Sequence, residues 1–259
     1  MPGSKKSRYA RTRGPRSSRH SKKRFHRRRT HSRRRKRSVI TKKLHGLGGS
    51  PFGRHIYTKF SFDHTIFLSG QSGHVKYQAY RLNSLYDPNY TSSNVLDLQP
   101  RYFDTLLGAG GNDKPYHDYY VYGAKVSVLI TNGNSHTPLA VGIVAYDVAN
   151  GGPSTDLTQA RARADTTVLN ISGYNGSKGA KKYKKYFRIG RLLGESAMDE
   201  DNKGMYNSNP AKSILMEVRG WDAFAGFGDG SHVTSTNFYI TTKITYYCKL
   251  TGRNNVANS

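Results

Sequence analysis

RHIYTKFSFDHTIFL, residues 54 to 68, alternates between apolar and polar side chains over most of its length. Because successive side chains of a strand point to opposite sides, one face would carry Ile56, Thr58, Phe60, Phe62, His64, Ile66 and Leu68. The stretch predicts a long β-strand with one mostly apolar face. It is the clearest indication of an all-β fold.

Similar runs follow along the chain, and they are rich in β-branched and aromatic residues. They span residues 74–82, 118–132, 139–148, 165–171, 181–192, 213–221 and 236–250. Two short helices are expected, one at 99–111, with Pro100 in its first turn and Gly108 near its end, and a weaker one at 154–165.

The connections between these strands are uneven and often long, which favours a Greek-key arrangement over an up-and-down barrel with short hairpins. Strand number alone does not separate a jelly roll from an immunoglobulin-like sandwich. The long connection at 83–117, with its expected helix, favours a single eight-stranded jelly roll, an antiparallel sandwich.

The first 46 residues have a different composition from the rest. They hold seven Lys, thirteen Arg and no acidic residue, so they carry +20 of the total charge of +26, and the first carboxylate of the chain is Asp63. Few apolar groups and mutual repulsion predict a disordered arm. We expect an arm at 1–46, a hinge at 47–53 and one jelly-roll domain at 54–259.

Dense positive charge on a flexible segment predicts sequence-tolerant binding to nucleic acid through release of counterions. Guanidinium groups also fork onto phosphates and stack on bases. The same clusters satisfy a nuclear localisation signal. The candidate residues are Lys22, Lys23, Arg24, Arg27, Arg28, Arg29, Arg33, Arg34, Arg35, Lys36, Arg37, Lys42 and Lys43.

A second basic cluster, SKGAKKYKKYFRIGR at 177–191, interleaves cations with aromatic residues. Such a strand could form a platform on which unpaired bases stack, or it could bury its aromatic side chains and turn its lysines to water. Both interpretations remain open. The possible second site consists of Lys181, Lys182, Tyr183, Lys184, Lys185 and Arg188.

No motif indicates a catalytic centre, a metal or a cofactor. The acidic stretch MDEDNKG at 198–204 resembles a calcium loop, but Lys203 and Pro210 stand where ligands are needed. GAGGNDKP at 108–115 lacks the ending of a phosphate loop. The single cysteine, Cys248, excludes an internal disulfide. No apolar run is long enough to cross a bilayer, and no secretory signal is found, so we expect no membrane insertion.

Three segments carry a resemblance to a known family: YDPNY at 86–90, QPRYFDTLLG at 99–108 and YHDYYVYGAKVSVLITN at 116–132. There the sequence resembles the capsid proteins of small circular single-stranded DNA viruses that encode a replication initiator, the circovirus-like group. In that group an Arg-rich arm precedes a jelly roll. The residues at comparable positions are Gln99, Pro100, Phe103, Asp104, Tyr119, Tyr122, Gly123 and Val126.

The resemblance implies a capsid protein that is not an enzyme and that assembles into an icosahedral shell of about 60 copies. Its arms would point inward onto a single-stranded DNA genome, and host nuclear import receptors would bring it to the nucleus. We therefore expect it in the virion and, during assembly, in the host nucleus. The sequence indicates no particular attachment factor on the host cell. The alternative is a cellular RNA- or DNA-binding structural protein, ribosomal or chaperone-like, with a basic anchoring tail.

Overall fold

The computed structural model describes residues 53–69, 76–91, 99–109, 114–133, 137–173, 179–222 and 237–253. The chain divides into two units, 1–46 and 47–259, and all described residues belong to the second. The predicted arm and nearly all of the predicted hinge therefore lie outside the described residues.

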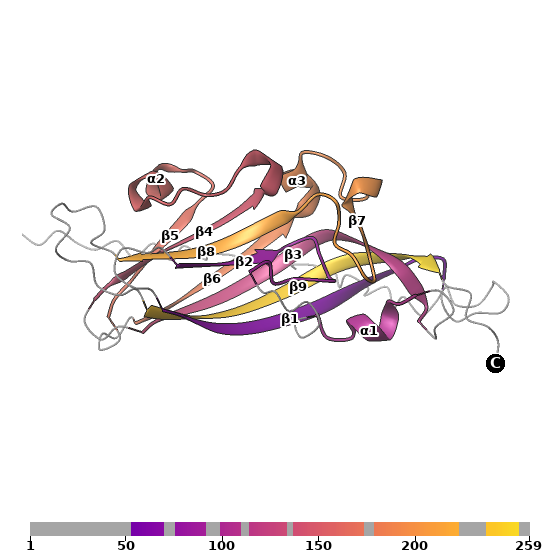
Figure 1. Cartoon of the computed structure of the whole chain (residues 1–259), viewed down its shortest axis with the longest axis horizontal. Coiled ribbons are helices and arrows are strands. Elements are labelled where there is room, and N and C mark those ends of the chain that lie inside the picture. Colours follow the sequence, from indigo (N-terminus) through magenta and orange to yellow (C-terminus); the bar gives the residue numbers. More distant parts are fainter. Residues whose placement is uncertain are drawn as a thin grey trace, which may run out of the picture. The chain divides into compact units, whose positions relative to one another are not determined.

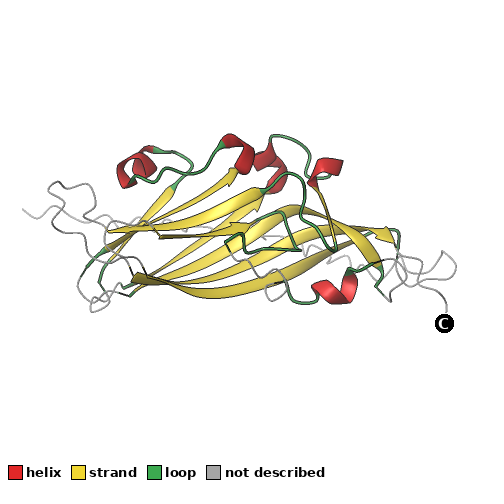
Figure 2. Cartoon of the chain, viewed as in Figure 1, coloured by secondary structure: helices red, strands yellow, loops and turns green. Residues whose placement is uncertain are grey.

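Two antiparallel sheets form the domain, and they lie one above the other (Figures 1 and 2). The first has the order β1 (Ile56–Ser69), β9 (Asn237–Arg253), β3 (Tyr116–Asn132) and β6 (Ala180–Arg188), with the short β7 (Lys203–Met205) also paired to β3. The second has the order β2 (Lys76–Arg81), β8 (Ile214–Asp222), β4 (Leu139–Asp147) and β5 (Thr167–Ile171).

This strand order confirms the predicted jelly roll. In an immunoglobulin-like sandwich the first two strands belong to the same sheet, whereas here β1 and β2 belong to different sheets. The strands of the first sheet each pair with partners distant in sequence, and β1 pairs with β9 along its whole length, from Ile56 opposite Leu250 to Ser69 opposite Asn237. Such pairing of early with late strands is the double Greek key of jelly rolls.

The main hydrophobic core lies between the two sheets. On β1 the predicted face is confirmed, with Phe60 and Phe62 each 2% exposed and Ile66 and Leu68 partly buried against the same core. The other sheet contributes Met216 to this cluster. The largest fully buried side chains are Tyr80, Tyr116, Tyr119, Tyr246, Phe60, Phe62, Phe238, Leu82, Leu85, Ile130, Leu139 and Ile143.

A smaller cluster covers the outer side of the four-stranded sheet. Trp221 of β8 packs with Leu157 and Ala160 of α2 (Leu157–Ala162). The indole nitrogen of Trp221 donates to the carbonyl oxygen of Thr155 at 2.7 Å, and the carboxylate of Asp156 caps the helix by accepting from the amide of Thr158. The helix predicted at 154–165 is therefore present, and it shields one end of this sheet.

The helix predicted at 99–111 is shorter than expected. The structure forms one turn, α1 (Phe103–Leu106), preceded by Tyr102 in the left-handed region with φ of 69°. The backbone is already extended again at Leu107. The reason is burial, because Phe103 and Leu107 both enter the core and Phe103 contacts the ring of Tyr119 at 6.3 Å between centroids.

Several short elements were not predicted. The strand expected at 181–192 ends at Arg188, and residues 189–193 form a helical turn, α3 (Ile189–Leu193), whose Ile189 is fully buried. Two 3-10 turns, η3 (Val148–Asn150) and η4 (Glu200–Asn202), and the short β7 are further elements that the sequence did not indicate.

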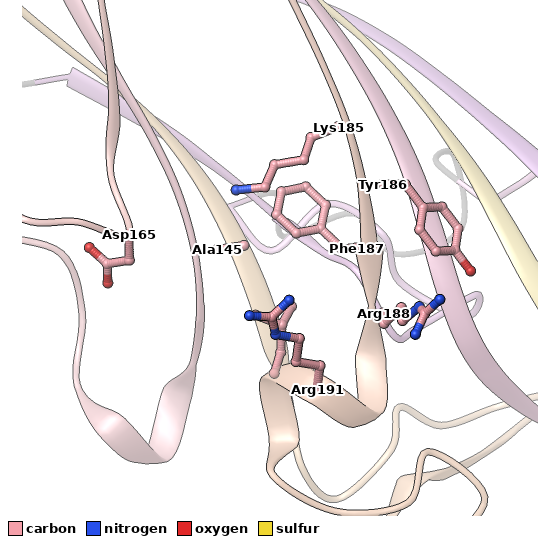
Figure 3. Close-up of a pocket in the computed structure, with 8 residues that line it drawn as sticks. Ala145, Asp165, Lys185, Tyr186, Phe187, Arg188 and Arg191 are labelled. Atoms are coloured by element: carbon pink, nitrogen blue, oxygen red, sulfur yellow. The ribbon is translucent and has the colours of Figure 1, made fainter.

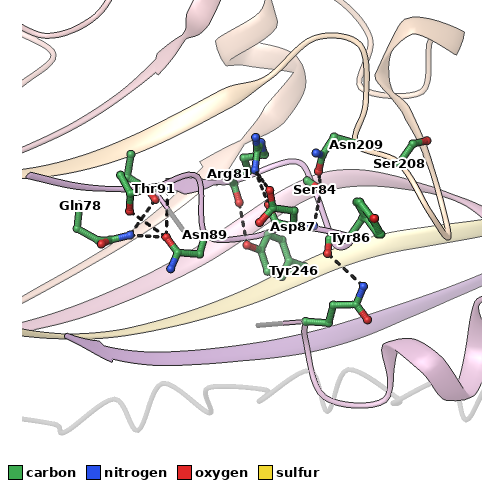
Figure 4. Close-up of polar contacts among 12 residues, drawn as sticks. Gln78, Arg81, Ser84, Tyr86, Asp87, Asn89, Thr91, Ser208, Asn209 and Tyr246 are labelled. Atoms are coloured by element: carbon green, nitrogen blue, oxygen red, sulfur yellow. Dashed lines mark hydrogen bonds and ion pairs between the residues drawn. The ribbon is translucent and has the colours of Figure 1, made fainter. Parts of the chain in front are cut away.

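Buried polar contacts fix the connection that follows β2 (Figure 4). Arg81 binds the carboxylate of Asp87 and donates to its carbonyl oxygen, while the hydroxyl of Tyr246 donates to the carbonyl oxygen of Arg81 at 2.8 Å. The side chain of Gln99 donates to the carbonyl oxygen of Tyr86 at 3.3 Å. The YDPNY and QPRYF segments of the resemblance therefore meet in space.

Tyr119 fastens the same connection from the other side. Its hydroxyl lies 3.2 Å from the hydroxyl of Ser84, accepts from the amide of Tyr86 at 3.2 Å and donates to the carbonyl oxygen of Ser208 at 3.3 Å. Burial raises the pKa of Tyr119 to about 12, so the phenol stays protonated over the physiological range. One side chain thus holds two long connections to the five-stranded sheet.

Candidate nucleic-acid interface

The first predicted site lies outside the described residues. It comprises the Lys and Arg residues from Lys22 to Lys43, all within the first unit of the chain. Binding of nucleic acid by these residues stays a prediction from the sequence.

The second predicted site lies on β6, the edge strand of the five-stranded sheet. The side chains of this site fall into two sets, which lie on opposite sides of the sheet. Alternation along the strand turns Lys182, Lys184 and Arg188 to the outer side of the sheet, where all three are exposed. Lys181, Tyr183 and Lys185 lie on the other side, the side on which Phe187 enters the core.

Tyr183 belongs to the packing of the domain rather than to an open surface. It is partly buried against the main core, and this burial raises the pKa of its phenol. Phe187, four residues further along the strand and on the same face, is 6% exposed. Of the three aromatic residues in the cluster, Tyr186 is the exposed one, at 46%.

The outer side of the five-stranded sheet adds cations from its other strands. Residues directly opposite one another in an antiparallel pair share a face, so the register groups Lys59 of β1, Lys125 of β3 and Lys243 and Lys249 of β9 with the outward residues of β6. We call this surface the basic face. Its cations are Lys59, Lys125, Lys182, Lys184, Arg188, Lys243 and Lys249.

Little negative charge opposes these cations. Asp63 of β1 lies directly opposite Lys243, and the two side chains form an ion pair of 3.4 Å between exposed groups. Within the described part of the chain, the other six cations make no ion pair with a carboxylate. They are available for the phosphates of a polyanion.

The sequence revealed the β6 portion of this surface and missed the rest. Lys59 and Lys125 are the only Lys or Arg residues of β1 and β3, and Lys243 and Lys249 lie six positions apart in β9, so these strands show no dense cluster in the sequence. The signal that could have indicated them is their alternation, since each occupies the polar side of a strand whose other side is apolar. Which polar sides share one surface depends on the pairing of the strands.

Beside β6 lies an open hollow of about 360 Å³ (Figure 3). Lys185 of β6 and Arg191 of α3 line it, and the amine of Lys185 lies 5.1 Å from the ring centroid of Phe187. Asp165, across the hollow, is already bound by Arg163 at 2.7 Å, which lowers the pKa of the Asp165 carboxyl. With Arg188, which also lines it, the hollow presents three cations at the edge of the sheet.

The carboxylates of the acidic stretch at 198–204 include Glu200 and Asp201, which contact lysines of the same domain. Glu200 binds the amine of Lys203 at 2.5 Å and accepts from the hydroxyl of Tyr120 at 3.0 Å. Lys212 lies 2.6 Å from Glu195 and 4.0 Å from Asp201. Among the residues that the structure describes, no group of three or more His, Cys, Asp or Glu side chains could hold a metal ion.

None of the helices in the described part of the chain is long and apolar enough to span a membrane. They are single turns or slightly longer.

No protein-family model and no curated protein sequence matches the chain. The solved structures similar to it include turnip yellow mosaic virus, at 12% identity over 82% of this chain and 89% of that chain, with a TM-score of 0.40. Sacbrood virus of honeybee is 13% identical over 78% and 88%, with a TM-score of 0.40. A 60-mer of the BFDV capsid protein is 13% identical over 80% and 100%, with a TM-score of 0.35. The jelly-roll assignment rests on the strand order of the two sheets rather than on these likenesses.

Proposed function

We propose that this chain is the capsid protein of a small virus, that it associates with copies of itself into a closed shell, and that its arm packages a single-stranded DNA genome. The observation that carries the proposal is the distribution of charge. Residues 1–46 hold +20, and the remaining 213 residues hold 22 basic and 16 acidic residues. A domain with near-balanced charge can pack against its own copies while a strongly basic arm binds a polyanion.

The difference in charge between the two sheets supports one orientation of the subunit in such a shell. The basic face of the five-stranded sheet offers unpaired cations, whereas on the four-stranded sheet Arg81 and Arg219 are each ion-paired, with Asp87 and Glu217. A subunit with one basic and one compensated side has an electrostatic reason to turn the basic side to the genome. We place the basic face toward the interior.

A count of charges supports packaging by the arm. Roughly 60 copies with +20 each would bring about 1200 positive charges into the shell. A circular genome of about two thousand nucleotides carries one negative charge per nucleotide, which is the same order of magnitude. The proposed role is structural, and no catalytic step is part of it.

Electron microscopy of the purified full-length protein tests the assembly. We expect uniform closed shells whose enclosed nucleic acid resists nuclease, because copies of one surface that close by symmetry give particles of one size. A protein that stays monomeric across a range of salt concentrations and pH contradicts the shell. That result would favour a cellular nucleic-acid-binding protein with an anchoring tail.

We also propose that the arm directs the protein to the host nucleus through import receptors, since these read exposed clusters of Lys and Arg. A fluorescent reporter fused to residues 1–45 is expected to accumulate in the nucleus. The matched control is the same fusion with Arg33, Arg34, Arg35, Lys36 and Arg37 changed to serine, which we expect to shift the reporter toward the cytoplasm. An intact fusion that stays cytoplasmic removes this role.

A further inference from the structure

Four tyrosines, one from each main strand of the five-stranded sheet, form a continuous row on the basic face. The ring centroids of Tyr57 and Tyr122 lie 6.2 Å apart, those of Tyr122 and Tyr247 lie 6.3 Å apart, and those of Tyr247 and Tyr186 lie 5.6 Å apart. The rings meet edge to face or tilted rather than stacked face on face. We call this row the tyrosine belt.

Two irregularities of the backbone make the belt possible. The register of β3 against β9 shifts between Val121, which is buried in the core, and Gly123, so Tyr122 is the extra residue of a bulge. The ring of Tyr122 is partly buried, and it lies beside the rings of Tyr57 and Tyr247. At Gly123, an added Cβ would collide with the hydroxyl of Tyr186, so glycine leaves room for that ring on the neighbouring strand.

The two outer rings of the belt are exposed, Tyr122 and Tyr247 between them are partly buried, and the belt is bordered by positive charge. Tyr57 is 53% exposed and Tyr186 is 46% exposed. Three of the four tyrosines stand directly opposite a lysine in the strand register, and the amine of the lysine opposite Tyr247 lies 5.1 Å from the ring centroid. The opposed pairs are Tyr57 with Lys249, Tyr247 with Lys59, and Tyr186 with Lys125.

A surface that alternates aromatic rings with unpaired ammonium groups matches one class of partner. In a single strand of nucleic acid the bases are free to stack on aromatic rings while the phosphates lie near cations, and each such stacking contact contributes substantially to affinity. In a duplex the base faces are already stacked on one another, so a duplex can use the cations but not the rings. Positive charge alone therefore does not distinguish single-stranded from double-stranded nucleic acid.

We propose that the tyrosine belt stacks unpaired bases and gives the basic face a preference for single-stranded over double-stranded nucleic acid. This inference rests on the proposed function, because it assigns the genome-facing role to the basic face. It goes further in naming the rings, rather than the arm, as the source of selectivity for the single-stranded form.

The test uses the full-length protein with Tyr57 and Tyr186 both changed to leucine, which removes two exposed rings and no charge. Affinity for an oligo(dT) strand is expected to fall about tenfold or more, since each stacked base is worth a factor of several to about a hundred. Affinity for a duplex with the same number of phosphates should not change. The slope of log affinity against log salt should also stay the same, because no cation is lost.

Two control variants make the result specific. Tyr77→Leu removes a ring of similar exposure, 47%, from β2 of the other sheet, and we expect no change in either affinity. Tyr57→Phe with Tyr186→Phe keeps both rings and should retain the preference for the single strand. Equal losses on both nucleic acids, or no loss on the single strand, would overturn the proposal.

A second measurement needs no variant and covers the case in which the leucine variant does not fold. Full-length wild-type protein is irradiated with an oligonucleotide that contains 5-iododeoxyuridine, and the crosslinked residues are mapped by mass spectrometry. Crosslinks at Tyr57, Tyr122, Tyr186 or Tyr247 support the belt, whereas crosslinks confined to the arm or to other tyrosines exclude it.

Electron microscopy of the same samples separates the two proposals. If wild-type protein forms no shells but crosslinks through the belt, the belt stands and the capsid function fails. If the leucine variant loses shell formation while its affinity for oligo(dT) is unchanged, the belt is a contact between copies and the present inference is wrong.

Discussion

Deletion of residues 1–45 is expected to abolish copurification of nucleic acid while the domain stays folded. The deletion removes all twenty cations of the arm and none of the residues that form the core. If about ten phosphates are contacted, the slope of log affinity against log salt falls by about 7, and affinity near physiological salt falls by roughly a thousandfold or more. Binding of an oligonucleotide at several salt concentrations measures both changes, and circular dichroism checks the fold.

A shorter deletion supplies the control. Removal of residues 1–20 takes away seven cations and leaves the dense segment RFHRRRTHSRRRKRS intact. We expect it to keep most of the copurifying nucleic acid and to lower the salt slope in proportion to the lost charge. Nuclease-protected nucleic acid recovered undiminished from the longer deletion would instead place the main binding site on the basic face.

The strands were largely predictable because the pattern of apolar and polar residues that indicates a strand lies within the strand itself. Alternation in residues 54–68 indicated both the strand and the face that Phe60 and Phe62 turn to the core. The same local signal could not identify the partner of β1, since β9 lies near the other end of the chain. Partner choice depends on how the whole set of apolar faces closes into one core, which no single stretch records.

The candidate site was predictable to a smaller extent for the same reason. The cluster on β6 is dense in sequence and was found, but the structure turns Tyr183 into the packing and leaves Tyr186 exposed. Tyr186 gains its neighbours from strands that are not adjacent in sequence. The bulge at Tyr122 is a one-residue shift of register, and a period of two along the chain does not indicate where such a shift occurs.

A buried ion pair holds the outer side of the four-stranded sheet together. Arg219 donates to the carboxylate of Glu217 at 2.5 Å, and the two residues are 8% and 3% exposed. The guanidinium also donates to the carbonyl oxygen of Ser154 at 3.0 Å and lies 5.3 Å from the ring centroid of Tyr77. One side chain therefore joins β8, β2 and the segment that leads into α2.

Arg219→Leu is expected to destabilise the domain by about 3–5 kcal/mol near neutral pH, because it leaves the Glu217 carboxylate buried without its partner. Chemical denaturation of the variant and the wild type measures the difference in free energy of unfolding. The double variant Glu217→Gln with Arg219→Leu removes both charges and should recover much of the loss. A double variant as unstable as Arg219→Leu would show that packing, rather than the unpaired carboxylate, determines the cost.

The stability loss caused by Arg219→Leu should depend on pH in a definite direction. Burial raises the pKa of Glu217, and the neighbouring Arg219 opposes that rise. Without the guanidinium the pKa rises further, so the folded variant holds the proton more tightly than the unfolded chain does. Its stability is therefore greatest below the usual carboxyl range and falls as pH rises through the folded-state pKa. The loss caused by Arg219→Leu should be smaller at about pH 5 than at about pH 8, and a loss that does not change with pH would contradict the assignment to Glu217.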